Sequence, residues 1–224
     1  MKALLFDMDG VLVDVSCSYR KAIQETVAAF TGESVAEEVI RDYKNRGGFN
    51  NDWDLTERIL LDRRRMVDKK TIIKFFQDVY LGKNYSGLVR NETWLMEKNI
   101  IQEISRRYSC GIVTGRPAGD AGYVLKRFEM EPFFPVVITM DQVPEDKQKP
   151  HPLGLLMAMA EMNCSRGIYF GDNVDDMKAA GAAGMDAIGI IPPGADPDSH
   201  KKRLLRHGAV KVLDSINDIA EVLS

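Results

Sequence analysis

The sequence has few cysteines, no long apolar run and no strong excess of one charge. Its three cysteines are far apart, odd in number and without zinc-ligand spacing, which argues against a disulfide framework and predicts a reducing, cytoplasmic location. No apolar stretch approaches the roughly 18 residues of a membrane span, and acidic residues interrupt the first one, so neither membrane contact nor a signal peptide is expected. The formal net charge of −3 predicts no general polyanion-binding surface, and hence no nucleic-acid partner.

The first part of the 224-residue chain carries a helical pattern. From residue 15 to residue 88, apolar residues recur at helical spacing and no convincing strand occurs. Four helices are expected, over about Ser16 to Phe30, after a cap at Ser34, after a cap at Asn51 or Asp52, and over about Lys69 to Leu81. A helical block that follows a single strand predicts a separate small domain over residues 15–88.

The remainder of the chain has a different pattern of apolar residues. A helix is expected over about Asn91 to Arg107, and short apolar runs then alternate with helical stretches, which is typical of parallel strands joined by right-handed crossovers. Strands are expected at residues 2–6, 110–114, 135–139, 167–170, 187–191 and 210–213. The sequence therefore predicts a three-layer, Rossmann-like α/β core over residues 1–14 and 89–224. The polar stretch Pro192–His200 is expected to be a loop without an assigned role.

Two carboxylates follow the first strand. Asp7 and Asp9 lie two residues apart and precede Gly10, which permits a sharp turn. The carboxyl ends of parallel strands meet at one edge of a sheet, where functional groups gather. Carboxylates this close repel each other unless a cation neutralises them, and Mg²⁺ prefers such oxygen ligands. On its own, this stretch is equally consistent with an acidic turn.

Three later stretches add polar groups at strand ends or before helices: Thr114, Lys149 and the acidic run Asp172–Asp176. Taken singly, each is readily explained as a turn, loop or helix-capping residue. Taken together, they permit transfer of a phosphoryl group to a carboxylate, with fixed donors and a metal ion neutralising its oxygens. A second acid near the nucleophile can then move protons.

The order Asp-x-Asp-Gly-Val, strand–Thr, Lys-Pro-x-Pro and Gly-Asp-x-x-x-Asp resembles the four motifs of the haloacid dehalogenase superfamily. The helical insertion resembles the type-1 cap of its subfamily I, which includes phosphoglycolate phosphatases and β-phosphoglucomutase. This resemblance implies a Mg²⁺-dependent phosphatase that acts on a small phosphorylated metabolite through an aspartyl-phosphate. The stretch FNNDWDLT further resembles a group associated with imidazoleglycerol-phosphate or histidinol-phosphate metabolism, and it names no substrate.

The resemblance also assigns roles to individual residues. Asp7 matches the nucleophile, and Asp9 matches the general acid/base. Thr114 matches the phosphate-binding hydroxyl, and Lys149 matches the lysine that steadies nucleophile and phosphate.

The metal ligands follow from the same resemblance. They are Asp7, the main-chain carbonyl of Asp9, and Asp172. Asp176 matches the acid behind the metal ligands, although its neighbour Asp175 could take that place.

Alternatives remain open from the residues alone. A phosphomutase would use the same motifs, and a receiver-like phospho-acceptor would combine similar acids with a threonine and a lysine. Arg116, next to Gly115, could grip a second anionic group of the substrate. Asn50 and Asn51 could face the substrate if the cap closes over the core. The oligomeric state, monomer or homodimer, is left open.

Overall fold

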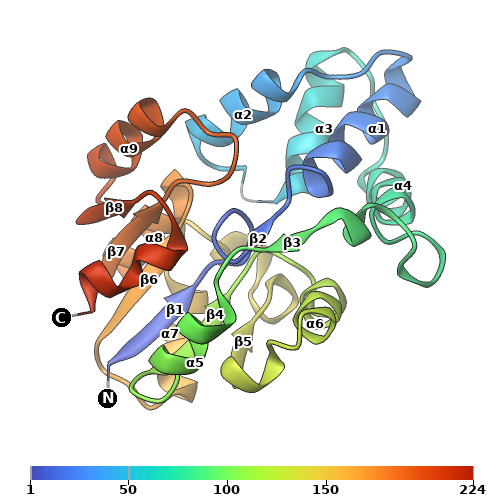
Figure 1. Cartoon of the computed structure of the whole chain (residues 1–224). Helices are drawn as coiled ribbons and strands as arrows, with labels where there is room; N and C mark the ends of the chain where they lie inside the picture. The colour runs from blue at the N-terminus through green and yellow to red at the C-terminus, as the bar shows by residue number, and fades with distance from the viewer. Residues whose placement is uncertain (1, 50, 224) are drawn as a thin grey trace. The chain divides into compact units, whose positions relative to one another are not determined.

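The computed structural model describes residues 2–49 and 51–223, and the chain divides into two compact units (Figure 1). One unit comprises the chain up to Asp14 together with the chain from Trp94 onward, and the other is Val15–Thr93. The chain leaves the first unit after β2 (Val13–Asp14) and returns through β3 (Thr93–Trp94), and these strands form a two-stranded sheet. We call the two parts the α/β unit and the helical unit.

The α/β unit is built on a six-stranded parallel sheet in the order β5-β4-β1-β6-β7-β8. Its strands are β1 (Ala3–Phe6), β4 (Ser109–Val113), β5 (Val136–Ile138), β6 (Gly167–Gly171), β7 (Asp186–Ile190) and β8 (Lys211–Leu213). The chain runs outward from β1 in both directions, so β1 lies where the strand order reverses. In open parallel sheets, ligands bind at this switch point, beyond the carboxyl ends of the strands.

Helices connect these strands and cover the sheet. They are α5 (Lys98–Ile104), α6 (Ala118–Arg127), α7 (Leu153–Glu161), α8 (Val174–Ala182) and α9 (Pro197–Arg206). Short 3₁₀ turns lie at Glu131–Phe133, Met140–Gln142, Glu145–Lys147 and Ile216–Val222. No helix within the described ranges is long and apolar enough to cross a membrane.

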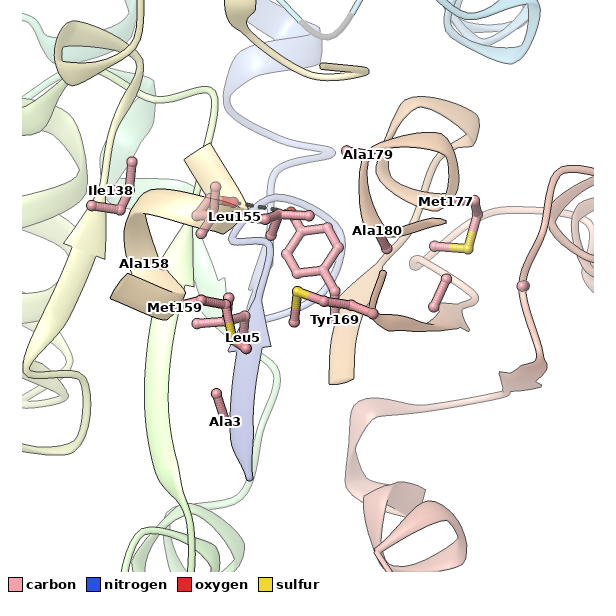
Figure 2. Close-up of a cluster of buried hydrophobic side chains, with 14 of the residues drawn as sticks. Ala3, Leu5, Ile138, Leu155, Ala158, Met159, Tyr169, Met177, Ala179 and Ala180 are labelled. Carbon is pink, nitrogen blue, oxygen red and sulfur yellow. Dashed lines mark hydrogen bonds between the residues drawn. The ribbon is translucent and has the colours of Figure 1, made fainter. Parts of the chain in front are cut away.

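Both faces of the sheet are buried. Ala3 and Leu5 belong to a cluster with side chains of α7 and α8 (Figure 2), and Leu204 of α9 is part of the same cluster. Residues alternate between the two faces of a strand, so Phe6 points the other way. There Phe6 stacks on Phe170, with ring centroids 4.9 Å apart, and meets Phe134 edge-on at 5.8 Å. The prediction of a three-layer, Rossmann-like α/β core is confirmed.

The helical unit contains α1 (Tyr19–Thr31), α2 (Glu37–Arg46), α3 (Asp52–Asp62) and α4 (Lys69–Leu81), followed by 3₁₀ turns at Lys83–Tyr85 and Leu88–Asn91. Helix α1 packs against α3 and α4. The ring of Tyr19 stacks on that of Tyr80 at 4.2 Å and also contacts Phe76. Burial of these aromatic side chains supplies much of the apolar core of this unit.

Several local predictions are confirmed. Helix α4 has the predicted bounds, and Asn51 caps α3 by accepting a hydrogen bond from the main-chain N–H of Trp53 at 2.9 Å.

Others are wrong. Ser34 does not cap α2, whose N-cap is Ala36. The helix predicted over Asn91 to Arg107 is interrupted by β3, and only α5 is helical there. The predicted loop Pro192–His200 contains the start of α9, which Asp196 caps by accepting from the N–H of Ser199.

Candidate active site

The site begins where β1 ends. Asp7 is buried, and its N–H donates to the carbonyl of Phe170 on the neighbouring β6 at 2.8 Å. The chain then turns at Gly10, which has a φ of +77°. A Cβ at Gly10 would lie 2.3 Å from Oδ2 of Asp172. The turn thus requires glycine at position 10 for two reasons: its left-handed conformation and the close approach of the second acidic segment.

The second acidic segment joins β6 to α8. Asn173 caps α8 by accepting from the N–H groups of Asp175 and Asp176, at 2.9 and 3.2 Å. In return, Oδ2 of Asp176 accepts from the N–H groups of Asp172 and Asn173, both at 3.1 Å. Gly171 makes room for this carboxylate, because a Cβ there would lie 2.3 Å from Cβ of Asp176. A capping box therefore fixes the geometry of the segment.

Lys149 connects the two segments. Its ammonium donates to Oδ1 of Asp7 at 2.9 Å and to Oδ1 of Asp176 at 2.8 Å. A third hydrogen bond, of 3.0 Å, goes to the hydroxyl of Tyr169. An ammonium has three donors, so these contacts use all of them. The Tyr169 hydroxyl also lies 3.0 Å from the carbonyl of Val113 and 3.2 Å from Asp176.

Burial shapes the electrostatics of this cluster. Desolvation raises the pKa of the Asp7 carboxyl well above its ordinary value; Lys149 opposes this rise, and the neighbouring carboxylates add to it. Burial alone would lower the pKa of Lys149, but attraction to Asp176 and Asp7 raises it well above its ordinary value. The surroundings therefore favour the cationic form of Lys149 and disfavour the ionised form of Asp7.

The cluster can accept a divalent cation. Carboxylate oxygens of Asp7, Asp172 and Asp176 all lie within 4.8 Å of one another. Lys149 carries one positive charge and can balance only one of these three carboxylates. A hard divalent ion takes carboxylate oxygens as ligands and would balance the other two. The donor set therefore fits the metal ion that the sequence predicts.

A second ion pair lies beside the first. Thr114 follows β4, next to β1 in the sheet, and its Oγ1 accepts from the main-chain N–H of Arg116 at 3.1 Å. The Arg116 side chain is 1% exposed. Its Nε and one terminal nitrogen lie 2.6 and 2.5 Å from Oδ1 of Asp9. The hydrogen bonds thus link Thr114 and Asp9 through Arg116.

The structure brings together six of the residues that the sequence singles out: Asp7, Asp9, Thr114, Lys149, Asp172 and Asp176. Gly115 lies in the turn after Thr114. Asp176 lies in the cluster, whereas Oδ1 of Asp175 lies 4.0 Å from Lys178. Asn51 lies in the helical unit as the cap of α3, and Asn50 lies outside the described residues.

Sequence reasoning missed three features of this site. Arg116 was expected to grip substrate, yet its guanidinium contacts Asp9; its predicted role in substrate binding stays a prediction. Tyr169 reads as one more apolar strand residue, and nothing in the sequence points to its contact with Lys149. His200, whose Nε2 lies 2.7 Å from the carbonyl of Asp172, could have been placed on a helix from the Asp196-Pro197 start signal.

Comparisons with known proteins bear on this arrangement. The family model for haloacid dehalogenase-like hydrolases matches residues 4–190. An imidazoleglycerol-phosphate dehydratase of Phytophthora nicotianae is 37% identical over 200 residues, which cover 86% of this chain and 44% of that protein. The chain thus spans less than half the length of that relative.

Two further similarities cover nearly the whole of both partners. A phosphoglycolate phosphatase of Vibrio parahaemolyticus is 24% identical, over 100% of this chain and 96% of that protein. The crystal structure of a hydrolase from Pseudomonas syringae superposes with a TM-score of 0.77 at 19% identity, over 100% of this chain and 98% of that one. This structural likeness concerns the fold.

Proposed function

This chain belongs to the haloacid dehalogenase-like hydrolase family and is a phosphatase-type enzyme of its subfamily I, and on this premise we propose that it hydrolyses a small phosphorylated metabolite in a Mg²⁺-dependent reaction. One observation carries the proposal. The carboxylate of Asp7 lies at the switch point of the sheet, 2.9 Å from the Lys149 ammonium and within reach of Asp172 and Asp176.

The proposed reaction proceeds in two steps. Asp7 attacks the phosphorus of the substrate and forms an aspartyl-phosphate, while Asp9 protonates the leaving oxygen. Asp9 then takes a proton from the water that hydrolyses the aspartyl-phosphate. The Thr114 hydroxyl donates a hydrogen bond to a phosphoryl oxygen, since its Oγ1 accepts from Arg116 and can still donate its own proton. The Lys149 ammonium, whose three donors hold Asp7, Asp176 and Tyr169, stabilises the phosphoryl oxygens through its positive charge.

A metal ion would be held by Asp7, Asp172 and the main-chain carbonyl of Asp9. When bound there, Mg²⁺ would supply positive charge that neutralises the phosphoryl oxygens during transfer. Asp176 would act behind these ligands, because both of its oxygens already accept hydrogen bonds from Lys149 and the main chain. This assignment gives a role to each acid of the cluster.

We also propose that the helical unit is a type-1 cap that contacts the part of the substrate beyond its phosphate. Its position after the first strand and its helical content support this role. A reducing compartment, the cytoplasm, is proposed because Cys17, Cys110 and Cys164 are all free.

The test is a screen of phosphorylated metabolites, with p-nitrophenyl phosphate as a general substrate, for release of inorganic phosphate with Mg²⁺ or with EDTA. We expect turnover with Mg²⁺ and none with EDTA. Asp7→Asn should lower kcat by about 10⁴-fold or more, with an unchanged circular dichroism spectrum. Near-native turnover of Asp7→Asn, or full activity in EDTA, would contradict the proposal.

Product analysis separates the two alternative functions. A phosphomutase of the β-phosphoglucomutase type would return an isomeric phosphorylated sugar instead of inorganic phosphate. A receiver-like protein would retain the phosphoryl group on Asp7 without turnover.

A further inference from the structure

His200 is a buried histidine that lies outside the four motifs and beyond residue 190, where the family match ends. It lies on α9, is 7% exposed, and reaches back across 28 positions of sequence. Its Nε2 lies 2.7 Å from the main-chain carbonyl oxygen of Asp172. A side chain from the end of the α/β unit thus contacts the segment that carries a proposed metal ligand.

The neighbours of the ring determine where its proton lies. A carbonyl oxygen can only accept a hydrogen bond, so Nε2 carries a hydrogen and donates it to Asp172. The other ring nitrogen, Nδ1, lies 3.5 Å from a terminal nitrogen of Arg203, which can only donate. Both contacts therefore agree with a single arrangement, in which Nδ1 accepts and Nε2 donates.

Several contacts hold Asp172, including a hydrogen bond of 3.3 Å that the side-chain amide of Asn173 donates to its Oδ1. The main-chain N–H of Asp172 donates to Asp176 at 3.1 Å, and its carboxylate lies against the backbone of Gly10. His200 holds the carbonyl of the same residue. Contacts of this kind orient metal ligands before the metal arrives, and their loss weakens metal binding.

We propose that His200 is a positioning residue for the metal site: its Nε2–H fixes the peptide of Asp172 and so directs the Asp172 carboxylate toward the site shared with Asp7. The proposal rests on the metal site of the proposed function. It gives α9 a role that neither its sequence nor the family match assigns.

The test compares three variants of His200 that differ in reach and chemistry. Gln places its amide N–H where Nε2–H lies in histidine, Asn carries the same amide but cannot reach, and Ala removes the donor. His207→Ala is the control, since His207 is the C-cap of the same helix, is exposed and contacts the carbonyl of Arg203. Mg²⁺ affinity is measured by isothermal titration calorimetry without substrate, and folding by thermal melting in EDTA.

We expect His200→Ala and His200→Asn to weaken Mg²⁺ binding by about 10- to 100-fold. His200→Gln and His207→Ala should stay close to the wild-type affinity. With p-nitrophenyl phosphate, the first two variants should need more Mg²⁺ for half-maximal activity, whereas kcat at saturating Mg²⁺ should change much less. If His200→Ala fails to fold, the comparison of Gln with Asn decides.

Unchanged Mg²⁺ affinity in His200→Asn, or an equal loss in His200→Gln, would overturn the positioning role. These outcomes are separable from failure of the proposed function. A wild-type protein that binds Mg²⁺ but releases phosphate from no substrate would contradict the function alone. A wild-type enzyme that hydrolyses phosphate esters while His200→Asn binds Mg²⁺ normally would contradict only the role of His200.

Discussion

The helical unit and the α/β unit both bury carboxylates, but they surround them differently. In the helical unit, Glu92 is 1% exposed and accepts hydrogen bonds from the hydroxyls of Ser18 and Tyr80, at 2.8 and 3.0 Å. In the α/β unit, Asp7 lies among other acids and beside the ammonium of Lys149. Hydroxyl groups hold one oxygen of Glu92, whereas the acids gathered around Asp7 create a field that a phosphoryl group and a cation can use.

Reactive groups in this chain are marked by more than burial. Burial alone does not mark a reactive group, since Glu92 is as buried as Asp7. What distinguishes Asp7 is that its carboxylate is concentrated with others at the carboxyl ends of β1 and β6, where burial and like charge raise its pKa. Four changes test this contrast.

Lys149→Met removes the cation from the acid cluster. It should lower kcat by about 10³-fold, because the phosphoryl oxygens lose a fixed positive charge and Asp7 loses the group that holds it. It should also cost about 3–5 kcal/mol of unfolding free energy, because Asp7 and Asp176 lose their buried partner. Urea unfolding and steady-state kinetics measure both effects. Lys147→Met is the matched control, since Lys147 lies in the same loop but is exposed; equal losses in the two variants would contradict the assignment.

Arg116→Met removes the partner of Asp9. The side chain is buried, so we expect a loss of about 3 kcal/mol in unfolding free energy. The proper control is a double-mutant cycle with Asp9→Asn. The double variant should be more stable than the two single losses predict, by about 2 kcal/mol, because the interaction between the two side chains is lost in each single variant and cannot be lost twice. Strict additivity would show that the two side chains do not interact in solution.

Glu92→Gln tests the role of the buried carboxylate in the helical unit. The amide retains an acceptor oxygen for Ser18 and Tyr80, so the expected cost is about 1 kcal/mol of unfolding free energy. Activity on p-nitrophenyl phosphate should be unchanged. A large loss of kcat in a variant with normal stability would mean that the carboxylate of Glu92 has a catalytic function.

The pH dependence of stability is expected to differ between wild type and Asp7→Asn. Burial raises the pKa of Asp7 in the folded protein, so the folded state binds this proton more tightly than the unfolded chain. The contribution of Asp7 to the unfolding free energy is complete at pH values below the pKa of about 3.9 in the unfolded chain. This contribution is lost as pH rises through the pKa of Asp7 in the folded protein. In EDTA, the unfolding free energy of wild type relative to Asp7→Asn should therefore fall with rising pH. Parallel pH curves would contradict this linkage.

Much of the fold could be predicted because it depends on local patterns. The apolar runs that became β1 and β6 and the helical periodicity of α4 are visible in the sequence without any tertiary information. Helix α9 escaped notice because it is a polar surface helix, and only His200 and Leu204 are buried on it. A helix with so few apolar residues has no hydrophobic periodicity to detect.

The candidate site likewise has residues that the sequence predicts and contacts that it does not. The acids, the threonine and the lysine follow strands or precede helices, so topology alone predicts that they meet. The contacts of Arg116 with Asp9, of Tyr169 with Lys149 and of His200 with Asp172 join residues 107, 20 and 28 positions apart. Such pairs depend on how side chains pack, and no local pattern encodes them.

The central claim is that Asp7 carries the phosphoryl group during turnover. The most direct measurement is to quench the reacting enzyme with borohydride, which reduces an aspartyl-phosphate to homoserine, and to sequence the peptide that contains residue 7 by mass spectrometry. We expect homoserine at position 7, formed only when substrate and Mg²⁺ are both present. Homoserine at another aspartate, or none during sustained turnover, would contradict it.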